Sequence, residues 1–172
     1  MQLAVQKHFL KNIDEIRDKI FRITKRILVS KEEAEDATQE VILKLWQMDP
    51  EKRDGFKSLE AYSVTMAKNY CLDRLKSKQA QTLSLDERFG GVNSDSVQKK
   101  IEQVDELNLV QELIDKLPEK ERLIIQLREI EQYDFNEIAS ILNLPEGTIR
   151  VYLSRIRKKL RKQFIELQNN GN

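Results

Sequence analysis

Cysteine, histidine, glycine and proline are all scarce in this chain of 172 residues, which has 5 Gly and 3 Pro. The only cysteine is Cys71 and the only histidine is His8. A single cysteine excludes an internal disulfide and cannot by itself form a zinc site. The sequence also has no glycine-rich phosphate loop and no ligands at metal-binding spacing. We therefore expect no catalytic residue, metal or cofactor, and do not expect an enzyme.

Long hydrophobic runs are also missing. No apolar stretch approaches the ~18 residues that a membrane span requires. Charged and polar residues interrupt the N-terminal region at Lys7, His8, Lys11 and Asp14, so a cleavable signal peptide is not expected. The single cysteine suits a reducing compartment. These absences predict a cytoplasmic protein without membrane insertion.

Charged residues make up 34% of the chain and aromatic residues 6%. Together with the few glycines and prolines, this composition favours an all-α protein. The formal net charge is only +1, so total charge does not indicate a nucleic-acid partner. Any such signal must come from the distribution of charge along the chain.

The spacing of apolar residues divides the chain into two parts. Apolar residues recur at helical intervals in the first part and again from Val104 onward. The segment 79–101 between them breaks this period, is rich in Ser, Gln, Asp and Lys, and contains Gly90-Gly91. We interpret it as a flexible linker. The sequence thus predicts two small helical domains, residues 1–78 and 102–172.

The second domain has the helix start and end signals that are expected of a helix-turn-helix. Pro118 stands where a first helix begins, at a position where its missing N–H costs nothing. Asp134 and Glu137 have capping-box spacing and open a short second helix. Asn143 tolerates the left-handed backbone that ends it, and a third helix follows from Glu146. A short helix, a tight turn and a longer helix form the unit that enters a DNA major groove.

The third helix has two distinct faces. One is an apolar stripe at three- and four-residue spacing, which predicts burial: Ile149, Leu153, Ile156, Leu160 and Phe164. The other is polar and basic: Thr148, Arg150, Ser154, Arg155, Arg157, Lys158 and Lys159. Most charge runs are simply solvated surfaces. The capped helix, the turn and the apolar stripe together favour DNA binding over that alternative.

In the first domain, Ser30 and Glu33 open a helix that runs to Trp46. Its inward positions are small or apolar, and its outer face combines acids with Leu43 and Trp46. Acids in the first turns suit the helix dipole, which is a purely structural explanation. A large aromatic residue beside charges is also typical of an anchor for a protein partner. Periodicity alone leaves both interpretations open.

A further helix is predicted from Ser58, its N-cap, to about Lys78. Val64, Ala67 and Cys71 mark its buried side. Opposite them, basic residues alternate with amides and tyrosines, a mixture that suits single-stranded nucleic acid. Tyrosines at helical spacing are more often part of a core, so this face alone is a weak indication.

These segments, taken in order, resemble bacterial RNA polymerase sigma factors. Ala34-Glu-Asp-Ala-Thr-Gln-Glu-Val-Ile-Leu-Lys-Leu-Trp46 resembles the second conserved region, and Met66-Ala-Lys-Asn-Tyr-Cys-Leu-Asp-Arg-Leu75 resembles the adjoining segment that reads the downstream promoter element. Further segments resemble the fourth conserved region: Leu117-Pro-Glu-Lys-Glu-Arg122, Ile138-Ala139, Gly147-Thr-Ile-Arg150 and Ser154-Arg-Ile-Arg-Lys-Lys-Leu160. Two such blocks joined by a short linker are similar to the extracytoplasmic-function (ECF) group, which lacks the middle domain of primary sigma factors.

The resemblance implies a role for each surface. The first set of residues would dock on a coiled coil of the largest polymerase subunit: Asp36, Gln39, Glu40, Leu43 and Trp46. The second would capture unstacked non-template bases of the melted downstream element: Phe56, Tyr62, Lys68, Asn69, Asp73, Arg74 and Lys76. The third would bind the double-stranded upstream element: Thr148, Arg150, Tyr152, Ser154, Arg155 and Lys158.

The function that the resemblance implies is that of an alternative sigma factor. Such a protein binds core RNA polymerase, directs it to specific promoters, promotes DNA melting and commonly has an anti-sigma partner. The alternative is a conventional dimeric helix-turn-helix regulator that acts without docking on the core polymerase. The chain departs from the family pattern at Val151-Tyr152, where many members carry Ser-Arg, and at Tyr62, where tryptophan is frequent.

Overall fold

The structure is a computed structural model that describes the backbone of residues 2–89 and 106–171. Side chains are described for residues 9–84 and 106–171. All elements in the described backbone are helical, so the all-α prediction is confirmed. They are α1 (Gln2–Leu28), α2 (Lys31–Gln47), α3 (Pro50–Asp54), α4 (Leu59–Phe89), α5 (Glu106–Asp115), α6 (Glu119–Ile125), the π-helical turn η1 (Gln126–Ile130), α7 (Phe135–Leu142) and α8 (Glu146–Asn170). None of them is long and apolar enough to cross a membrane.

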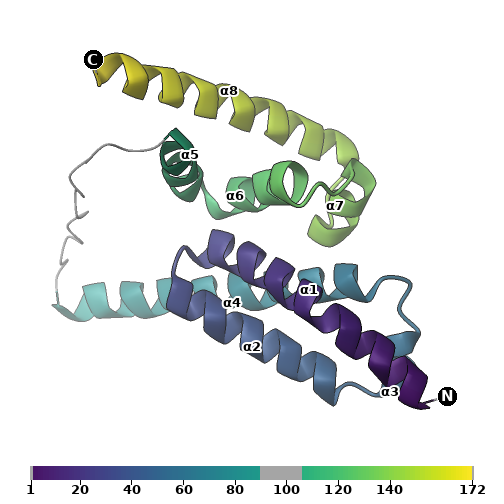
Figure 1. The fold of residues 1–172 in the computed structure, drawn as a ribbon. Coiled ribbons are helices and arrows are strands. Elements are labelled where there is room, and N and C mark those ends of the chain that lie inside the picture. Colours follow the sequence, from purple (N-terminus) through teal and green to yellow (C-terminus); the bar gives the residue numbers. More distant parts are fainter. Residues whose placement is uncertain (1, 90–105, 172) are drawn as a thin grey trace.

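Helices α1, α2 and α4 pack against one another and form the first domain (Figure 1). Their apolar stripes meet in a core that contains Ile13, Ile20, Val41, Leu45 and Ala67, all of them buried. The predicted inward residues of α2 and α4 therefore do face the core. This packing leaves the opposite faces of both helices toward solvent.

Helix α4 extends beyond the predicted boundary at Lys78 and reaches Phe89. The prediction that residues 79–89 form part of the linker is therefore wrong for the backbone. The first strong helix-breaking residues of this segment are Gly90-Gly91, whereas Ala80, Gln81 and Leu83 favour helix. The rest of the predicted linker, 90–101, lies outside the described residues.

The second domain contains α5, α6, η1, α7 and α8, in the helix-turn-helix order predicted from the sequence. Pro118 directly precedes α6, and η1 continues that helix with a wider turn. Asp134 accepts a hydrogen bond from the Glu137 backbone N–H at 2.8 Å, and Glu137 accepts one from the Asp134 N–H at 2.9 Å. This is the predicted capping box. Asn143 has φ of 52°, so the left-handed end of α7 is also confirmed.

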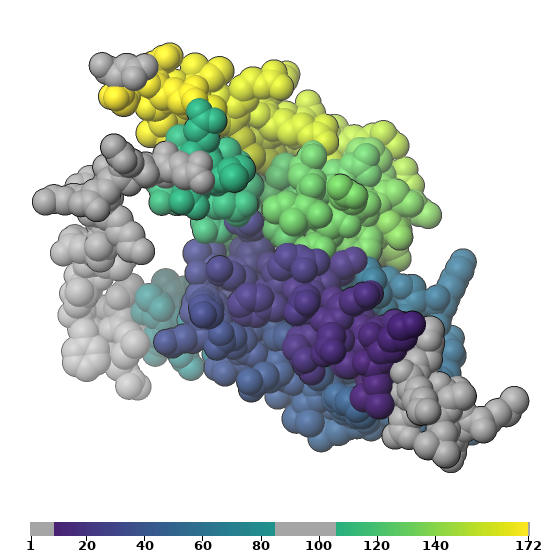
Figure 2. Space-filling model, in the orientation of Figure 1, coloured from purple at the N-terminus to yellow at the C-terminus, as the bar shows by residue number. Residues whose placement is uncertain are grey.

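The two domains lie directly against each other (Figure 1). Buried residues of α1, including Ile23 and Ile27, belong to the same contiguous hydrophobic cluster as Leu117, Leu127 and Ile138 of the second domain. Figure 2 shows the same arrangement in space-filling form, with the second domain seated along α1. The sequence predicted two domains but gave no indication of a core shared between them.

Candidate nucleic-acid interface

The outer face of α2 holds the residues predicted to dock on the polymerase, and we call it the α2 surface. Helix α2 begins after Ser30, whose Oγ accepts a hydrogen bond from the Glu33 N–H at 3.4 Å. Glu40 is half-buried, and the other members are exposed: Asp36, Gln39, Leu43 and Trp46. Leu43 is 50% exposed and Trp46 is 42% exposed. The α2 surface therefore joins acids to two large apolar side chains that face solvent.

Trp46 is held in place although much of it is exposed. Its ring meets the Phe9 ring edge-on, with centroids 5.2 Å apart and an interplanar angle of 86°. Beside it is an open hollow of about 440 Å³, lined by Arg17, Thr38, Gln39, Ile42, Leu43 and Trp46. An aromatic side chain fixed on one side and open on the other is suited to anchoring a partner.

The α4 surface comprises the exposed side of α4 and the loop before that helix. Ser58 caps the helix, because its Oγ accepts a hydrogen bond from the Ala61 N–H at 3.1 Å. Asn69 and Asp73 are exposed and lie one turn apart on the same side. They border a shallow hollow of about 260 Å³ lined by Lys44, Tyr62, Thr65, Met66, Asn69, Tyr70 and Asp73. The hollow thus brings an amide, a carboxylate and two tyrosines together.

Phe56 lies against the ring of Tyr62, which lines this hollow. Their centroids are 4.0 Å apart with an interplanar angle of 22°, so the rings are stacked. Both side chains are half-buried. A stacked pair limits the motion of Tyr62 and prepares its surroundings for a planar ligand.

Two other residues predicted for the α4 surface are engaged elsewhere, and a third is exposed. Lys68 Nζ donates a hydrogen bond to the Ile141 carbonyl of α7 at 2.9 Å, and burial lowers the pKa of this lysine. The Arg74 guanidinium lies 3.9 Å from Glu33 and 3.8 Å from Asp36, close to α2. Lys76 is exposed further along α4. In this structure, therefore, neither Lys68 nor Arg74 lines the hollow with Asn69.

The α8 surface is the solvent-facing side of α8. Ile149, Leu153 and Ile156 are buried, as the apolar stripe predicted, and they fix the orientation of the helix. Arg150, Ser154, Arg155 and Lys158 are exposed on other sides. The exposed side is centred on Ser154, Arg155 and Lys158, because these positions lie opposite the buried stripe on a helix of 3.6 residues per turn.

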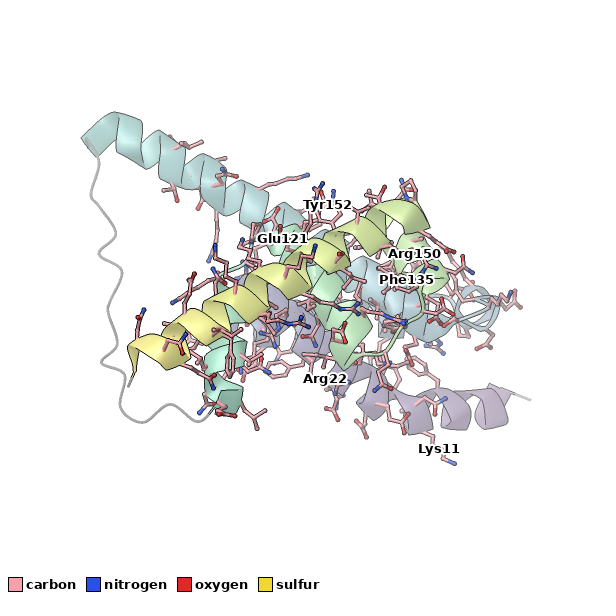
Figure 3. All side chains as sticks on the ribbon, turned by 90° about the horizontal axis from the view of Figure 1, so that it is seen from above. Lys11, Arg22, Glu121, Phe135, Arg150 and Tyr152 are labelled. Carbon is pink, nitrogen blue, oxygen red and sulfur yellow. The ribbon has the colours of Figure 1, made fainter. Side chains whose placement is uncertain are left out.

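Three members of the α8 surface lie on its flanks. The Arg150 guanidinium carbon is 4.1 Å from the Phe135 ring centroid, and Figure 3 shows these two side chains together at the start of α8. On the opposite flank, the Lys120 ammonium of α6 lies 5.1 Å from the half-buried Tyr152 ring. Thr148 lies on that same flank, one turn before Tyr152, and is half-buried.

Sequence reasoning missed a group of residues that joins the two domains. Arg22 and Arg26 of α1 contact Glu131, Gln126 and Asp115 of the second domain. In the sequence, Arg22 and Arg26 are simply basic residues on an amphipathic helix, and no motif marks them. A partner that is remote in sequence cannot be read from local spacing.

Comparison with family models agrees with both blocks of the resemblance. The model for sigma-70 region 2 matches residues 13–81, and a model for sigma-70 region 4 matches residues 107–160. The first match covers α1 to most of α4, and the second covers α5 to the apolar stripe of α8.

Individual relatives match over nearly the whole chain. The ECF RNA polymerase sigma factor SigW of Bacillus subtilis is 30% identical, with 94% of this chain and 91% of the relative covered. SigL of Mycobacterium tuberculosis, also an ECF RNA polymerase sigma factor, is 24% identical, with 92% and 88% covered.

Two solved structures share the fold. The sigma factor RpoE from Bartonella quintana, in complex with the anti-sigma factor NepR, matches with a TM-score of 0.73 at 20% identity, covering 93% of this chain and 98% of that one. CnrH in complex with the cytosolic domain of CnrY matches with a TM-score of 0.60 at 16% identity, covering 96% and 90%.

Proposed function

The chain belongs to the extracytoplasmic-function family of RNA polymerase sigma factors, and we propose that its α2, α4 and α8 surfaces each perform one step of transcription initiation. As an alternative sigma factor, it directs RNA polymerase to specific promoters. The regulator that would act without the polymerase has no support in these matches, since both sigma regions are present in one chain.

The α2 surface docks on the coiled coil of the largest polymerase subunit. Trp46 supplies the anchor, because its ring is braced by Phe9 and still 42% exposed. Leu43 extends the apolar patch, while Asp36 and Gln39 provide polar contacts at its edge. Interfaces of this kind take most of their energy from a few aromatic or large apolar residues.

The α4 surface holds unstacked bases of the melted non-template strand. Extracting a base from the duplex costs a few kcal/mol, and stacking on an aromatic side chain contributes about 1–3 kcal/mol per base. Tyr62, backed by Phe56, is placed to stack with a base, and the Asn69 amide can hydrogen-bond to a base edge. Together these contacts offset the cost of extraction.

The α8 surface enters the major groove of the upstream element. Arg155 and Lys158 lie near the middle of the exposed face, and Ser154 is small enough to let the helix approach the bases. We assign Arg155 to a base edge or a phosphate and Lys158 to a phosphate. Arg150 contacts DNA from the flank, directed by its contact with Phe135.

The remaining partners follow from this role. The protein acts without catalysis of its own, in the cytoplasm where the polymerase is found. An anti-sigma factor would regulate it by covering one or more of the three surfaces. One solved structure of similar fold, RpoE, is a sigma factor in complex with the anti-sigma factor NepR.

The observation that carries the proposal is that one chain presents a braced tryptophan on α2, an aromatic hollow on α4 and a basic face on α8. Substitution Asn69→Asp tests the assignment of the α4 surface. It places a carboxylate where the amide would meet a base, without a change in side-chain size. We expect normal binding to the core polymerase and reduced promoter opening, measured as permanganate reactivity of unpaired thymines.

Gln81→Glu provides the matched control, because it makes the same amide-to-acid change at an exposed position further along α4. This variant should open promoters like the unmodified protein. Equal opening by the Asn69 variant and the control would exclude Asn69 from base capture, and loss of core binding by the Asn69 variant would show that the substitution acts elsewhere.

A further inference from the structure

Val151 is an exposed aliphatic residue in the middle of the polar and basic α8 surface. It is 50% exposed, whereas the neighbouring aliphatic residues Ile149, Leu153 and Ile156 are buried in the core. Single exposed apolar residues are common on protein surfaces. The role of Val151 therefore has to be argued from the residues that surround it.

Val151 lies on the side of α8 that faces away from the core. Residues three, four and seven positions apart share one side of a helix, so Val151 lies beside Ser154, Arg155 and Lys158, all of them exposed. It belongs to the second turn of α8, which begins at Glu146. In a helix-turn-helix, the N-terminal residues of the second helix contact the edges of the bases. Val151 thus occupies a position that faces the bases when α8 lies in the major groove.

Gly147 precedes Val151 by one turn on the same side of α8. A Cβ atom added at this glycine would meet no atom of the described chain within 4 Å beyond its own part of the helix. The packing of the protein therefore does not require a glycine there, although glycine makes a helix less stable than alanine does. Glycine also permits a ligand to approach the backbone closely. With Ser154 one turn later, Val151 has small neighbours in both directions along the helix.

The long side chains next to Val151 are held on the two flanks of α8. The Arg150 guanidinium carbon lies 4.1 Å from the centroid of the Phe135 ring (Figure 3). On the other flank, the Tyr152 ring faces the Lys120 ammonium of α6 at 5.1 Å. Val151 keeps half of its surface exposed between these two flanks. The centre of the α8 surface therefore presents an aliphatic side chain between small residues.

The major groove offers one apolar group that matches such a side chain. Every base pair presents hydrogen-bond donors and acceptors there, and thymine alone adds a methyl group, at C5. A valine placed against a donor or an acceptor would remove its water without replacing the hydrogen bond, which is unfavourable. Against a methyl group, the same burial is favourable. The chemistry of Val151 therefore selects thymine.

We propose that Val151 contacts the C5 methyl group of a thymine in the upstream promoter element and determines the preferred base at that position. This inference rests on the proposed function of the α8 surface. Arg155 follows Val151 by about 6 Å along the helix, and successive bases of a strand are about 3.4 Å apart. The thymine therefore lies within about two base pairs of the group that Arg155 contacts. Val151 supplies base preference, while Arg155 and Lys158 supply hydrogen bonds and charge.

Replacing thymine by deoxyuridine tests the contact, because it removes the methyl group and leaves every hydrogen-bonding group in place. Polymerase reconstituted from core enzyme and this protein first selects promoters from a DNA library with a randomised upstream duplex. Each thymine of the selected upstream element, on either strand, is then replaced singly by deoxyuridine. The dissociation constant of the polymerase is measured for each promoter. Since the protein is the same throughout, its folding cannot cause a difference.

At one position, loss of the methyl group should weaken binding about fourfold, the factor expected for one methyl group removed from an apolar contact. Polymerase with Val151→Ser should bind the thymine and deoxyuridine promoters equally. Serine and valine have similar helix propensities, so α8 should stay folded. Val110→Ser makes the same substitution at a valine of α5 that is 37% exposed, and this control should retain the fourfold difference. Val151→Ser should also leave the salt dependence of binding unchanged, because valine contacts no phosphate.

The role of Val151 would be overturned if no thymine showed a methyl effect, or if Val151→Ser retained the effect. A salt dependence altered by Val151→Ser would also overturn it, since the change would then act on phosphate contacts. A polymerase that contains this protein yet selects no upstream sequence would contradict the proposed function of the α8 surface itself. That result differs from selection of an upstream element without a methyl effect, which would contradict the role of Val151 alone.

Discussion

Replacing Trp46 by alanine should remove most of the anchoring energy of the α2 surface. The side chain leaves 42% of its area exposed, which for a tryptophan of about 250 Å² amounts to about 100 Å². Covering that area with a partner contributes about 2.5 kcal/mol at about 25 cal/mol per Å². The dissociation constant for core polymerase should therefore rise roughly 60-fold.

The assay is a titration of fluorescently labelled protein with core polymerase, followed by anisotropy. Leu83→Ala is a matched control, since Leu83 is 59% exposed on the distal part of α4. The buried remainder of the tryptophan, about 145 Å², contributes about 3.5 kcal/mol to folding at about 25 cal/mol per Å², so its loss should lower the midpoint of thermal unfolding by about 7–14 °C. An affinity within threefold of the unmodified protein, or an equal loss with Leu83→Ala, would refute the assignment of Trp46 as the anchor.

Three further predictions concern the helix-turn-helix and the contact between domains. Arg155→Ala should weaken specific promoter binding by about 1–3 kcal/mol if the arginine reads a base; an equal loss on every DNA sequence would indicate a phosphate contact alone. Asp134→Ala removes the α7 capping box and should cost about 1 kcal/mol, seen as a fall of about 2–4 °C in the unfolding midpoint, whereas Asp134→Ser should retain stability. Burial alone would raise the pKa of Glu60, but hydrogen bonds from Lys19 and Tyr133 lower it below its usual value of 4.5. A lowered folded-state pKa contributes stability above the unfolded value, and that stability is lost as pH falls through the folded value. The free energy of unfolding should therefore fall less steeply with decreasing pH below 4.5 for Glu60→Gln than for the unmodified protein. Identical pH dependences of the two proteins would exclude a role for this carboxylate.

Helix positions and buried faces were largely predictable because they depend on local spacing and capping chemistry. Asp134 and Glu137 lie three residues apart and satisfy each other's backbone, so the sequence alone located the start of α7. The end of α4 was less predictable. Hydrophilic residues after Lys78 resemble a linker in composition, yet they have adequate helix propensity, and the helix continues to Phe89.

The directions of long side chains could not be predicted, because they depend on the other domain. Lys68 has the sequence position of a nucleic-acid contact, but in the structure it donates to the Ile141 carbonyl. Arg74 likewise lies near Glu33 and Asp36 of α2. A helical period identifies the face on which a residue lies, whereas its partner depends on tertiary packing. The α8 surface depends less on such packing, and its central residues are exposed as predicted.

We propose that this chain acts on promoters only as part of RNA polymerase. Gel filtration of the purified protein with bacterial core polymerase, and separately with genomic DNA fragments, tests this dependence. We expect co-elution with the core enzyme and little sequence-selective binding to DNA by the free protein. Failure to bind core, together with tight and selective binding to DNA by the protein alone, would contradict it.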